Sequence, residues 1–199
     1  FSACTNLTSV NLSNINLSNV TNMQAMFYKC SSLTSVDLSN KDLSSVTNIN
    51  DMFQMCNSLI SIDLSNTNLN KVQFTNNIFA NLSNLETINL NNTDLSGVTS
   101  MLAMFNGCSS LTSVNLSNID LSNVTDMTAM FNACSNLTIT ITINSSKITS
   151  YNAMFKGAAT NSNAKITVNY TEETSNLVDQ MIATKSENSN VVKGSIINN

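Results

Sequence analysis

A single repeat length of 26 residues runs through this 199-residue sequence and constrains its fold more than any other feature. Phenylalanine recurs at this interval at Phe1, Phe27, Phe53, Phe79, Phe105 and Phe131, and Phe155 follows after 24 residues. Cysteine recurs in the same phase, with one leucine in the series, at Cys4, Cys30, Cys56, Leu82, Cys108 and Cys134. Two independent columns in one register predict a solenoid, in which successive segments lie over one another and equal positions align.

Two apolar periodicities alternate within each repeat. Val10 and Leu12 are separated by one polar residue, which is the alternation typical of a strand. Met23, Met26 and Phe27 follow the spacing of one face of a short helix. Threonine stands just before these apolar residues, where a helix N-cap is wanted, at Thr21, Thr47, Thr99 and Thr125. Each turn is therefore predicted to hold a strand and a short helix, with the strands forming one parallel sheet, an α/β repeat architecture.

The repeat changes towards the C-terminal end. The turn that begins at Cys134 is two residues shorter and alternates apolar residues with threonine. Residues 165–170 are predicted to form a last strand. Residues 171–185 are predicted to form a helix with Glu172 and Glu173 in its first turn, whose apolar stripe would cap the open end of the stack.

These patterns divide the chain into two parts. Residues 1–157 are predicted to form the solenoid, whose first repeat is truncated at the N-terminus, so that further sequence is expected upstream. Residues 158–199 are predicted to form a C-terminal cap of strand, helix and tail. Within this cap, residues 191–197 are predicted to add an edge strand.

Composition argues against several classes of function. Charged residues make up only 10% of the chain, the net charge is −4, and histidine is absent. An acidic chain without arginine is a poor partner for nucleic acid, because affinity for polyanions depends on neutralising phosphates. Without histidine or a glycine-rich phosphate loop, no nucleophile–base arrangement, enzyme activity or cofactor is expected. No apolar run reaches the ~20 residues of a membrane span, so none is expected here.

The repeat also resembles a known family. One unit contains the run LTSVDLSN at Leu33–Asn40, the segment Val46–Phe53, and an M-F-x-x-C element that ends at Cys56. It is similar to the BspA-type leucine-rich repeats of bacterial surface proteins, over residues 1 to about 157. The resemblance implies a right-handed leucine-rich-repeat solenoid on a cell-surface or secreted protein, with a role in adhesion and no catalytic residues to carry over.

Cysteine and methionine are the first candidates for chemistry. Cysteines at a 26-residue pitch are compatible with a metal ladder or a disulfide framework, but no close C-x-x-C pair occurs, so buried, inert thiols are favoured and no metal site is expected. The methionines beside the phenylalanine column can be read as a soft-metal or a promiscuous binding surface, but their helical spacing favours a place in the core. These are Met23, Met26, Met52, Met101, Met104, Met127, Met130 and Met154.

The outward positions of the predicted strands are the candidate ligand-binding residues. They form stacked columns of short polar side chains: Ser9, Asn11, Ser35, Asp37, Ser61, Asp63, Thr87, Asn89, Ser113 and Asn115. Solenoids bind partners across such a face, but small polar residues also simply solvate a sheet, and the sequence leaves both readings open. A calcium site at Asp37 and Asp63 is disfavoured, because neighbouring turns replace the acids with asparagine and no glycine loop is present.

Two further features belong to the framework in this interpretation. Asparagine follows the strand in each regular repeat and is predicted to form a stacked ladder with hydrogen bonds to the backbone of the next turn. The ladder residues are Asn14, Asn40, Asn66, Asn92 and Asn118. In the third repeat, which departs from the family pattern, Phe74 stands beside Thr75 in the methionine column. Phe74 can repack the core there or be displayed as a binding anchor, and repacking is favoured.

The sequence thus supports two functions of different kinds. The first is an extracellular module that binds a protein or glycan partner through the sheet face. The alternative is a structural spacer or surface subunit that self-associates by stacking end to end. An ice-binding surface is disfavoured, because the outward face lacks a consistent threonine column.

Overall fold

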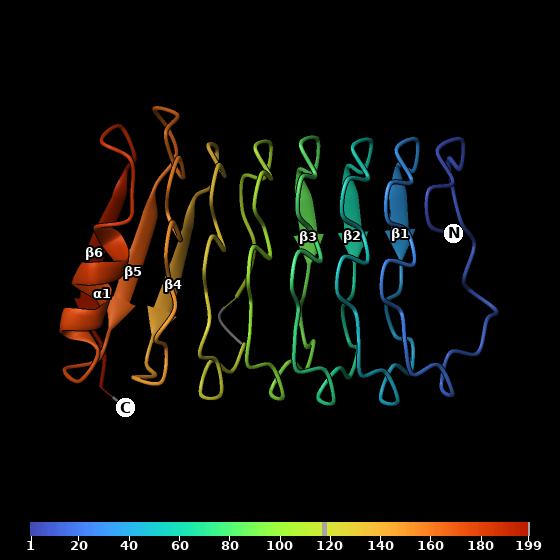
Figure 1. Ribbon diagram of the computed structural model, residues 1–199, viewed down its shortest axis with the longest axis horizontal. Coiled ribbons are helices and arrows are strands. Elements are labelled where there is room, and N and C mark those ends of the chain that lie inside the picture. The colour runs from blue at the N-terminus through green and yellow to red at the C-terminus, as the bar shows by residue number, and fades with distance from the viewer. Residues whose placement is uncertain (117–118, 199) are drawn as a thin grey trace.

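The computed structural model describes residues 1–116 and 119–198, which wind into a parallel β-solenoid of about six turns. Figure 1 shows the turns side by side along the long axis, with the N-terminus at one end and β6 and α1 at the other. The predicted stacking of the 26-residue segments is therefore confirmed.

The first sheet contains three short parallel strands, β1 (Ser35–Asp37), β2 (Ser61–Asp63) and β3 (Thr87–Asn89). Each residue pairs with the residue 26 positions further on, so that Ser35 lies opposite Ser61 and Ser61 opposite Thr87. The central residue of each strand is buried and its two neighbours point away from the core. The repeat length therefore sets the register of this sheet.

The second sheet holds longer strands, β4 (Ile139–Ile143), β5 (Ile166–Tyr170) and β6 (Val191–Ile196), paired in parallel in that order. The strand predicted at residues 165–170 and the edge strand predicted in the tail are both present. This sheet links residues on either side of position 157. The proposed division of the chain at that position stays a prediction.

A one-residue change of phase separates the two sheets. In the turn before β4, Leu111 and Val114 are buried and lie three positions apart. In the next turn, the corresponding buried residues Leu137 and Ile139 lie only two positions apart. Because side chains alternate along a strand, this step moves every later apolar residue to the opposite phase. The sheet is accordingly interrupted, and the described residues 113–116 form no strand between β3 and β4.

The short helices predicted opposite the sheet are absent from the described residues, and this expectation was wrong. Residues 23–30 form consecutive turns instead. The Ala25 N–H donates to the Asn50 carbonyl oxygen at 2.9 Å, and the Lys29 N–H donates to the Gln54 carbonyl oxygen at 2.9 Å. Ala25 and Lys29 have φ of 53° and 57°, a left-handed conformation that a right-handed helix excludes. The backbone donors here bond to the next turn of the solenoid rather than along a helix.

The threonines predicted as helix N-caps have a different role. The Thr47 hydroxyl donates to the Thr21 carbonyl oxygen at 3.1 Å, one turn earlier, and the Thr125 hydroxyl donates to the Thr99 carbonyl oxygen at 3.2 Å. These hydrogen bonds tie neighbouring turns together along the stack.

The phenylalanine column forms a continuous spine through the core. Successive rings from Phe1 to Phe155 lie 5.5–6.0 Å apart between centroids, with interplanar angles of 2–18°. The six rings from Phe27 onward are fully buried. Burying one such ring stabilises the fold by roughly 1.5–3 kcal/mol, and stacking adds about 0.5–1.5 kcal/mol per pair. The spine crosses the junction between the two sheets without a break.

The helix α1 (Ser175–Ile182) is shorter than the segment predicted at residues 171–185. It buries Val178 and Met181 and lies at the end of the stack beside β6 (Figure 1). Glu172 and Glu173 precede the helix, so the prediction that they form its first turn was wrong. A chain reversal at residues 171–174 occupies that position instead. The Thr174 N–H donates to the Thr171 carbonyl oxygen, the Thr171 N–H donates to the Thr174 hydroxyl oxygen, and this hydroxyl donates to the Ile143 carbonyl oxygen.

The stacking of the asparagine column is confirmed in the three central turns, but its hydrogen bonds differ from those predicted. The Asn66 amide donates to the Asn40 side-chain oxygen at 3.1 Å, and the Asn92 amide donates to the Asn66 side-chain oxygen at 2.9 Å. The bonds therefore join side chain to side chain, rather than side chain to backbone as predicted. All three residues have φ of 56°, a conformation that asparagine tolerates better than most residues. Asn118 lies outside the described residues.

Candidate functional site

The first sheet brings together six of the ten predicted ligand-binding residues. One column contains Ser35, Ser61 and Thr87, and a second contains Asp37, Asp63 and Asn89. Partners in a column lie at strand spacing, which is roughly 4.8 Å. Together these side chains and the strand backbone line a shallow groove of about 300 Å³. We call this surface the sheet face.

The other four predicted residues flank this surface without joining it in a strand. Ser9 and Asn11 lie in the turn before β1, and Ser113 and Asn115 lie in the turn after β3. All four are exposed. The Asn115 amide donates to the Asn91 side-chain oxygen at 3.0 Å, a residue 24 positions earlier, so the exact repeat spacing is lost there.

The two acids of the sheet face are held by local backbone hydrogen bonds. One carboxylate oxygen of Asp37 accepts from the Ser39 N–H at 2.8 Å, and Asp63 accepts from the Ser65 N–H at 2.8 Å. The second oxygen of Asp63 accepts from the Asn89 amide at 3.1 Å. Burial, the largest single influence, raises the pKa of Asp63, but these hydrogen bonds together lower it below its ordinary value. Asp63 is therefore a fixed negative charge at neutral pH.

The same hydrogen bond recurs where asparagine replaces the acid. In this column, the Asn11 and Asn89 side-chain oxygens accept from the backbone N–H two residues further on, at 3.0 and 3.1 Å. Asparagine and aspartate thus fill one structural role, since both offer the accepting oxygen. This backbone hydrogen bond alone therefore does not require the negative charges of Asp37 and Asp63.

The cysteine column is a buried structural element. Cys30, Cys56, Cys108 and Cys134 are free and fully buried. The Cys56 thiol donates to the Phe27 carbonyl oxygen at 2.8 Å, and burial raises the pKa of Cys56 and of Cys108 to about 12. These thiols stay protonated at neutral pH and are poor nucleophiles. Cys4, also predicted to be buried, is exposed.

Phe74 departs from the expectation that it repacks the core. Its side chain is 45% exposed, and the fully buried Thr75 takes the core position. Equivalent residues such as Asn48 accept a hydrogen bond from the N–H two residues further on, which phenylalanine cannot do. The Asn76 N–H donates instead to the Asn50 side-chain oxygen of the previous turn, at 3.0 Å.

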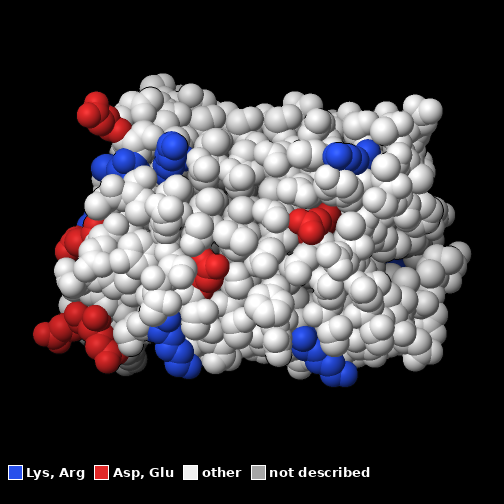
Figure 2. Space-filling view, in the orientation of Figure 1, with Lys and Arg blue, Asp and Glu red and all other residues white. Residues whose placement is uncertain are grey.

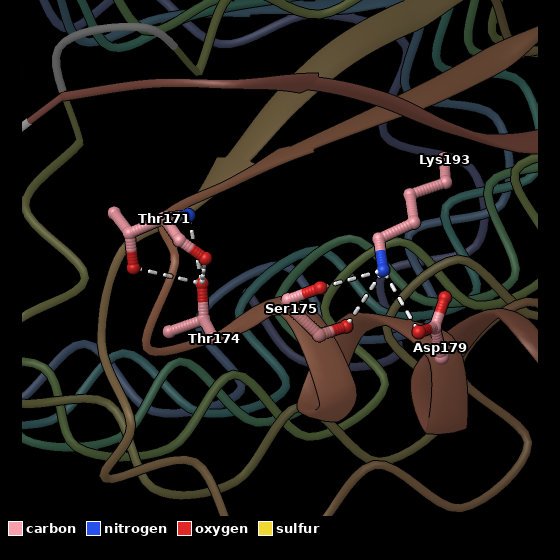
Figure 3. Close-up of polar contacts among 5 residues, drawn as sticks. All are labelled: Thr171, Thr174, Ser175, Asp179 and Lys193. Atoms are coloured by element: carbon pink, nitrogen blue, oxygen red, sulfur yellow. Dashed lines mark hydrogen bonds and ion pairs between the residues drawn. The ribbon is translucent and has the colours of Figure 1, made fainter.

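A polar cluster that the sequence did not reveal joins α1 to the second sheet (Figure 3). The Lys193 ammonium donates to the Ser175 hydroxyl and carbonyl oxygens at 2.9 and 3.0 Å, and to the Asp179 carboxylate at 2.8 Å. It also lies 4.5 Å from the centre of the Tyr170 ring. A serine beside a lysine resembles a catalytic pair, but this ammonium is bonded to three acceptors and cannot take the serine proton. The cluster is a structural link.

Charge gives little sign of a site elsewhere. In the view of Figure 2, charged side chains of both signs are scattered over a mostly uncharged surface, and acids are more frequent at the end bearing α1. The described residues bring together no group of three or more acidic, cysteine or histidine side chains suited to a metal ion. In the same part of the chain, no helix combines the length and hydrophobicity that a bilayer crossing needs.

These features define a repeat protein of the parallel β-solenoid class, with polar side chains in register along one sheet. The chain belongs to the family described as "Mycoplasma protein of unknown function, DUF285", which matches residues 1–113 and 75–193. No curated protein and no solved structure matches the chain. The family description names no activity or partner, so the BspA-type and leucine-rich-repeat names suggested by the sequence stay predictions.

Proposed function

We propose that this solenoid is a non-enzymatic binding module that contacts an extracellular protein or glycan through the sheet face. The observation that carries the proposal is the in-register alignment of outward polar side chains on β1, β2 and β3. Such a surface is held rigid by the core beneath it. The protein therefore loses little conformational entropy when it binds a partner whose hydrogen-bonding groups have a matching spacing.

The acids favour this function over simple solvation of the sheet. Asparagine accepts the same local backbone hydrogen bond in other turns, so this bond alone does not explain why two acids, Asp37 and Asp63, stand at adjacent positions. Two neighbouring carboxylates on a flat face attract partners with positive charge or several hydroxyl donors. The proposed partner is a basic protein segment or a hydroxyl-rich glycan.

The proposal includes a setting at the cell surface or outside the cell. The sequence resemblance to BspA-type surface repeats supports this setting, and with it a right-handed leucine-rich-repeat winding. We further propose that α1, which buries Val178 and Met181 at the end of the stack, acts as the C-terminal cap.

The test is a binding assay with immobilised extracellular-matrix proteins and an array of surface glycans. The Asp37→Asn/Asp63→Asn double variant removes two charges while keeping both backbone hydrogen bonds. We expect at least a roughly threefold loss of affinity at low salt, because surface charges act mainly on association. Ser61→Arg, which places a long side chain at the centre of the sheet face, is expected to weaken binding by about tenfold or more.

A matched control is available on the same molecule. Asp42 and Asp94 also accept backbone hydrogen bonds two residues further on, and asparagine stands in their column at Asn16 and Asn68. The Asp42→Asn/Asp94→Asn double variant makes the same charge change away from the sheet face and should leave binding unchanged. Equal losses from both double variants, or from neither, would contradict the proposal. Sedimentation of the unmodified protein at several concentrations tests the rival stacking function.

A further inference from the structure

A cavity of about 350 Å³, with apolar walls and a polar rim, lies at the junction between the two sheets. The turn before β4 contributes Leu116, Ile119 and Leu121 to its wall, and β4 contributes Ile141. The cavity is separate from the sheet face, because it shares no lining residue with the groove over β1, β2 and β3.

Two features of the turn that contains β4 account for the cavity. The one-residue phase change after Leu137 prevents β4 from pairing in register with the preceding turn. The shorter turn also replaces a large residue with a small one. Counted back ten positions from Phe131 and Phe155, Leu121 corresponds to Ser145. Leucine occupies this position in the regular turns, so the shorter turn contributes a smaller side chain there.

The cavity wall is apolar and adaptable. Met101, Met104 and Met130 line it, and each is at most 2% exposed. Methionine adjusts its three side-chain torsions to the shape of a neighbour, which suits a wall that receives ligands. A cavity of about 150 Å³ lined by leucine, isoleucine and phenylalanine is able to bind benzene, so this larger one has room for a molecule of roughly twice that size.

The cavity rim is polar but uncharged. Thr140, Thr142 and Asn144 complete the lining, and no charged side chain is among the described lining residues. Their side chains make no hydrogen bond within the part of the chain that the structure describes, so they are available to a ligand. We propose that the cavity binds a small neutral organic molecule with an apolar body and one hydroxyl or carbonyl group, which bonds at the rim.

The test uses three probes of one shape: 1-naphthol, naphthalene and 1-naphthoate. Carbon-13 labelling of the methionine methyl groups reports binding by NMR. We expect 1-naphthol to shift Met101, Met104 and Met130 with a one-to-one stoichiometry, while the buried Met52, which does not line the cavity, stays unchanged. Naphthalene should bind about tenfold more weakly without its hydroxyl group, and 1-naphthoate more weakly still because its charge would be buried.

Two variants fill the cavity. Leu121→Phe and Ile119→Phe each add volume at its wall and should weaken 1-naphthol binding by about tenfold or more. Leu69→Phe is the matched control, since Leu69 stands in the same column as Leu121 but in a turn without the cavity. It should destabilise the protein by overpacking, whereas Leu121→Phe should not.

Each possible result decides the proposal. Leu69→Phe is expected to be destabilised because its turn has no cavity. If Leu121→Phe is destabilised as much or fails to fold, the cavity does not have the volume described and the proposal is overturned. Shifts of Met52 equal to those of the lining methionines would indicate non-specific binding and would also overturn it. Undiminished binding to Ile119→Phe, or tighter binding of 1-naphthoate than of 1-naphthol, would refute the site or the ligand class.

Discussion

The two sheets of this solenoid are built by different means. In the first, strands of three residues are aligned by an unvarying 26-residue repeat, and loops, ladders and core columns keep the same register. In the second, strands of five and six residues pair through alternating apolar side chains, and the register shifts between Val168 and Tyr170. Strand length and apolar alternation thus replace repeat regularity as the source of order.

The junction between them teaches which interactions tolerate a change of phase. The sheet does not, because one residue reverses the direction of every side chain after it. The phenylalanine spine does, since Phe105, Phe131 and Phe155 remain stacked at 5.8 and 6.0 Å across the junction. A shortening of two residues is absorbed elsewhere in the turn. The spine therefore connects two regions that hydrogen bonding alone would leave separate.

The largest expected effect tests whether the spine unites the two regions. Phe131→Ala removes a fully buried ring between two stacked neighbours and should destabilise the protein by about 3–5 kcal/mol. Hydrogen exchange should show lost protection in both β2 and β5. Phe74→Ala, at an exposed ring outside the spine, is the control and should change stability by no more than about 0.5 kcal/mol. Loss of protection in β4–β6 alone would show that the regions unfold independently.

A smaller effect is expected from restoring the regular three-residue spacing between Leu137 and the first apolar residue of β4. Inserting one serine after Thr138 recreates the order Leu–Thr–Ser–apolar found at Leu111–Val114. The insertion should let β4 pair with residues 113–116, and three new cross-strand pairs at about 0.2–1 kcal/mol each would stabilise the protein by about 1–2 kcal/mol. Denaturant unfolding measures the gain, and amide exchange should slow at residues 113–116. Inserting the serine after Ser146, in a loop beyond β4, is the control. A destabilisation specific to the first insertion would contradict the phase argument.

The smallest expected effect is a pH dependence of stability that arises from Asp63 in the first sheet. Asp63 has a lowered pKa in the folded protein, so its carboxylate stabilises the fold above the unfolded pKa of about 3.9, and this contribution is lost as the pH falls through the folded pKa. Because Asp63 is partly exposed, the contribution should stay below about 1 kcal/mol. Melting temperatures of the unmodified protein and Asp63→Asn should therefore differ at pH 7 and converge below pH ~4. Parallel curves across this range would refute the assignment.

Much of the framework could be predicted from the sequence because a fixed period converts sequence position into spatial position. The spine, the buried cysteines after Cys4, the pairing of Asp37 with Asp63 and the central asparagine ladder all follow from the 26-residue interval. The short helices were wrongly predicted, because apolar residues at helical spacing fit consecutive turns equally well. Nothing in the composition distinguishes Ala25 in a left-handed turn from an alanine in a helix.

The junction was missed for a different reason. The spacing of Leu137 and Ile139 is visible in the sequence, but its consequence depends on what the previous turn places opposite. The sequence predicts Phe74 in the core because the small Thr75 occupies a methionine position, whereas in the structure threonine alone completes the layer and donates to the Ser100 carbonyl oxygen. The cluster around Lys193 joins this residue to partners 14 to 23 positions earlier in the chain, which only the fold brings together.

Residues in the left-handed backbone conformation make each turn of the solenoid dependent on its neighbouring turns during folding. Each turn holds a non-glycine residue with φ between 52° and 58° at one position: Ala25, Asp51, Asn77, Ala103, Ala129 and Ala153. Such conformations cost about 1–3 kcal/mol each, and an isolated segment has no neighbouring backbone to compensate for them. A nucleus must therefore span several turns before growth becomes favourable, and a detached 26-residue peptide should remain a random coil.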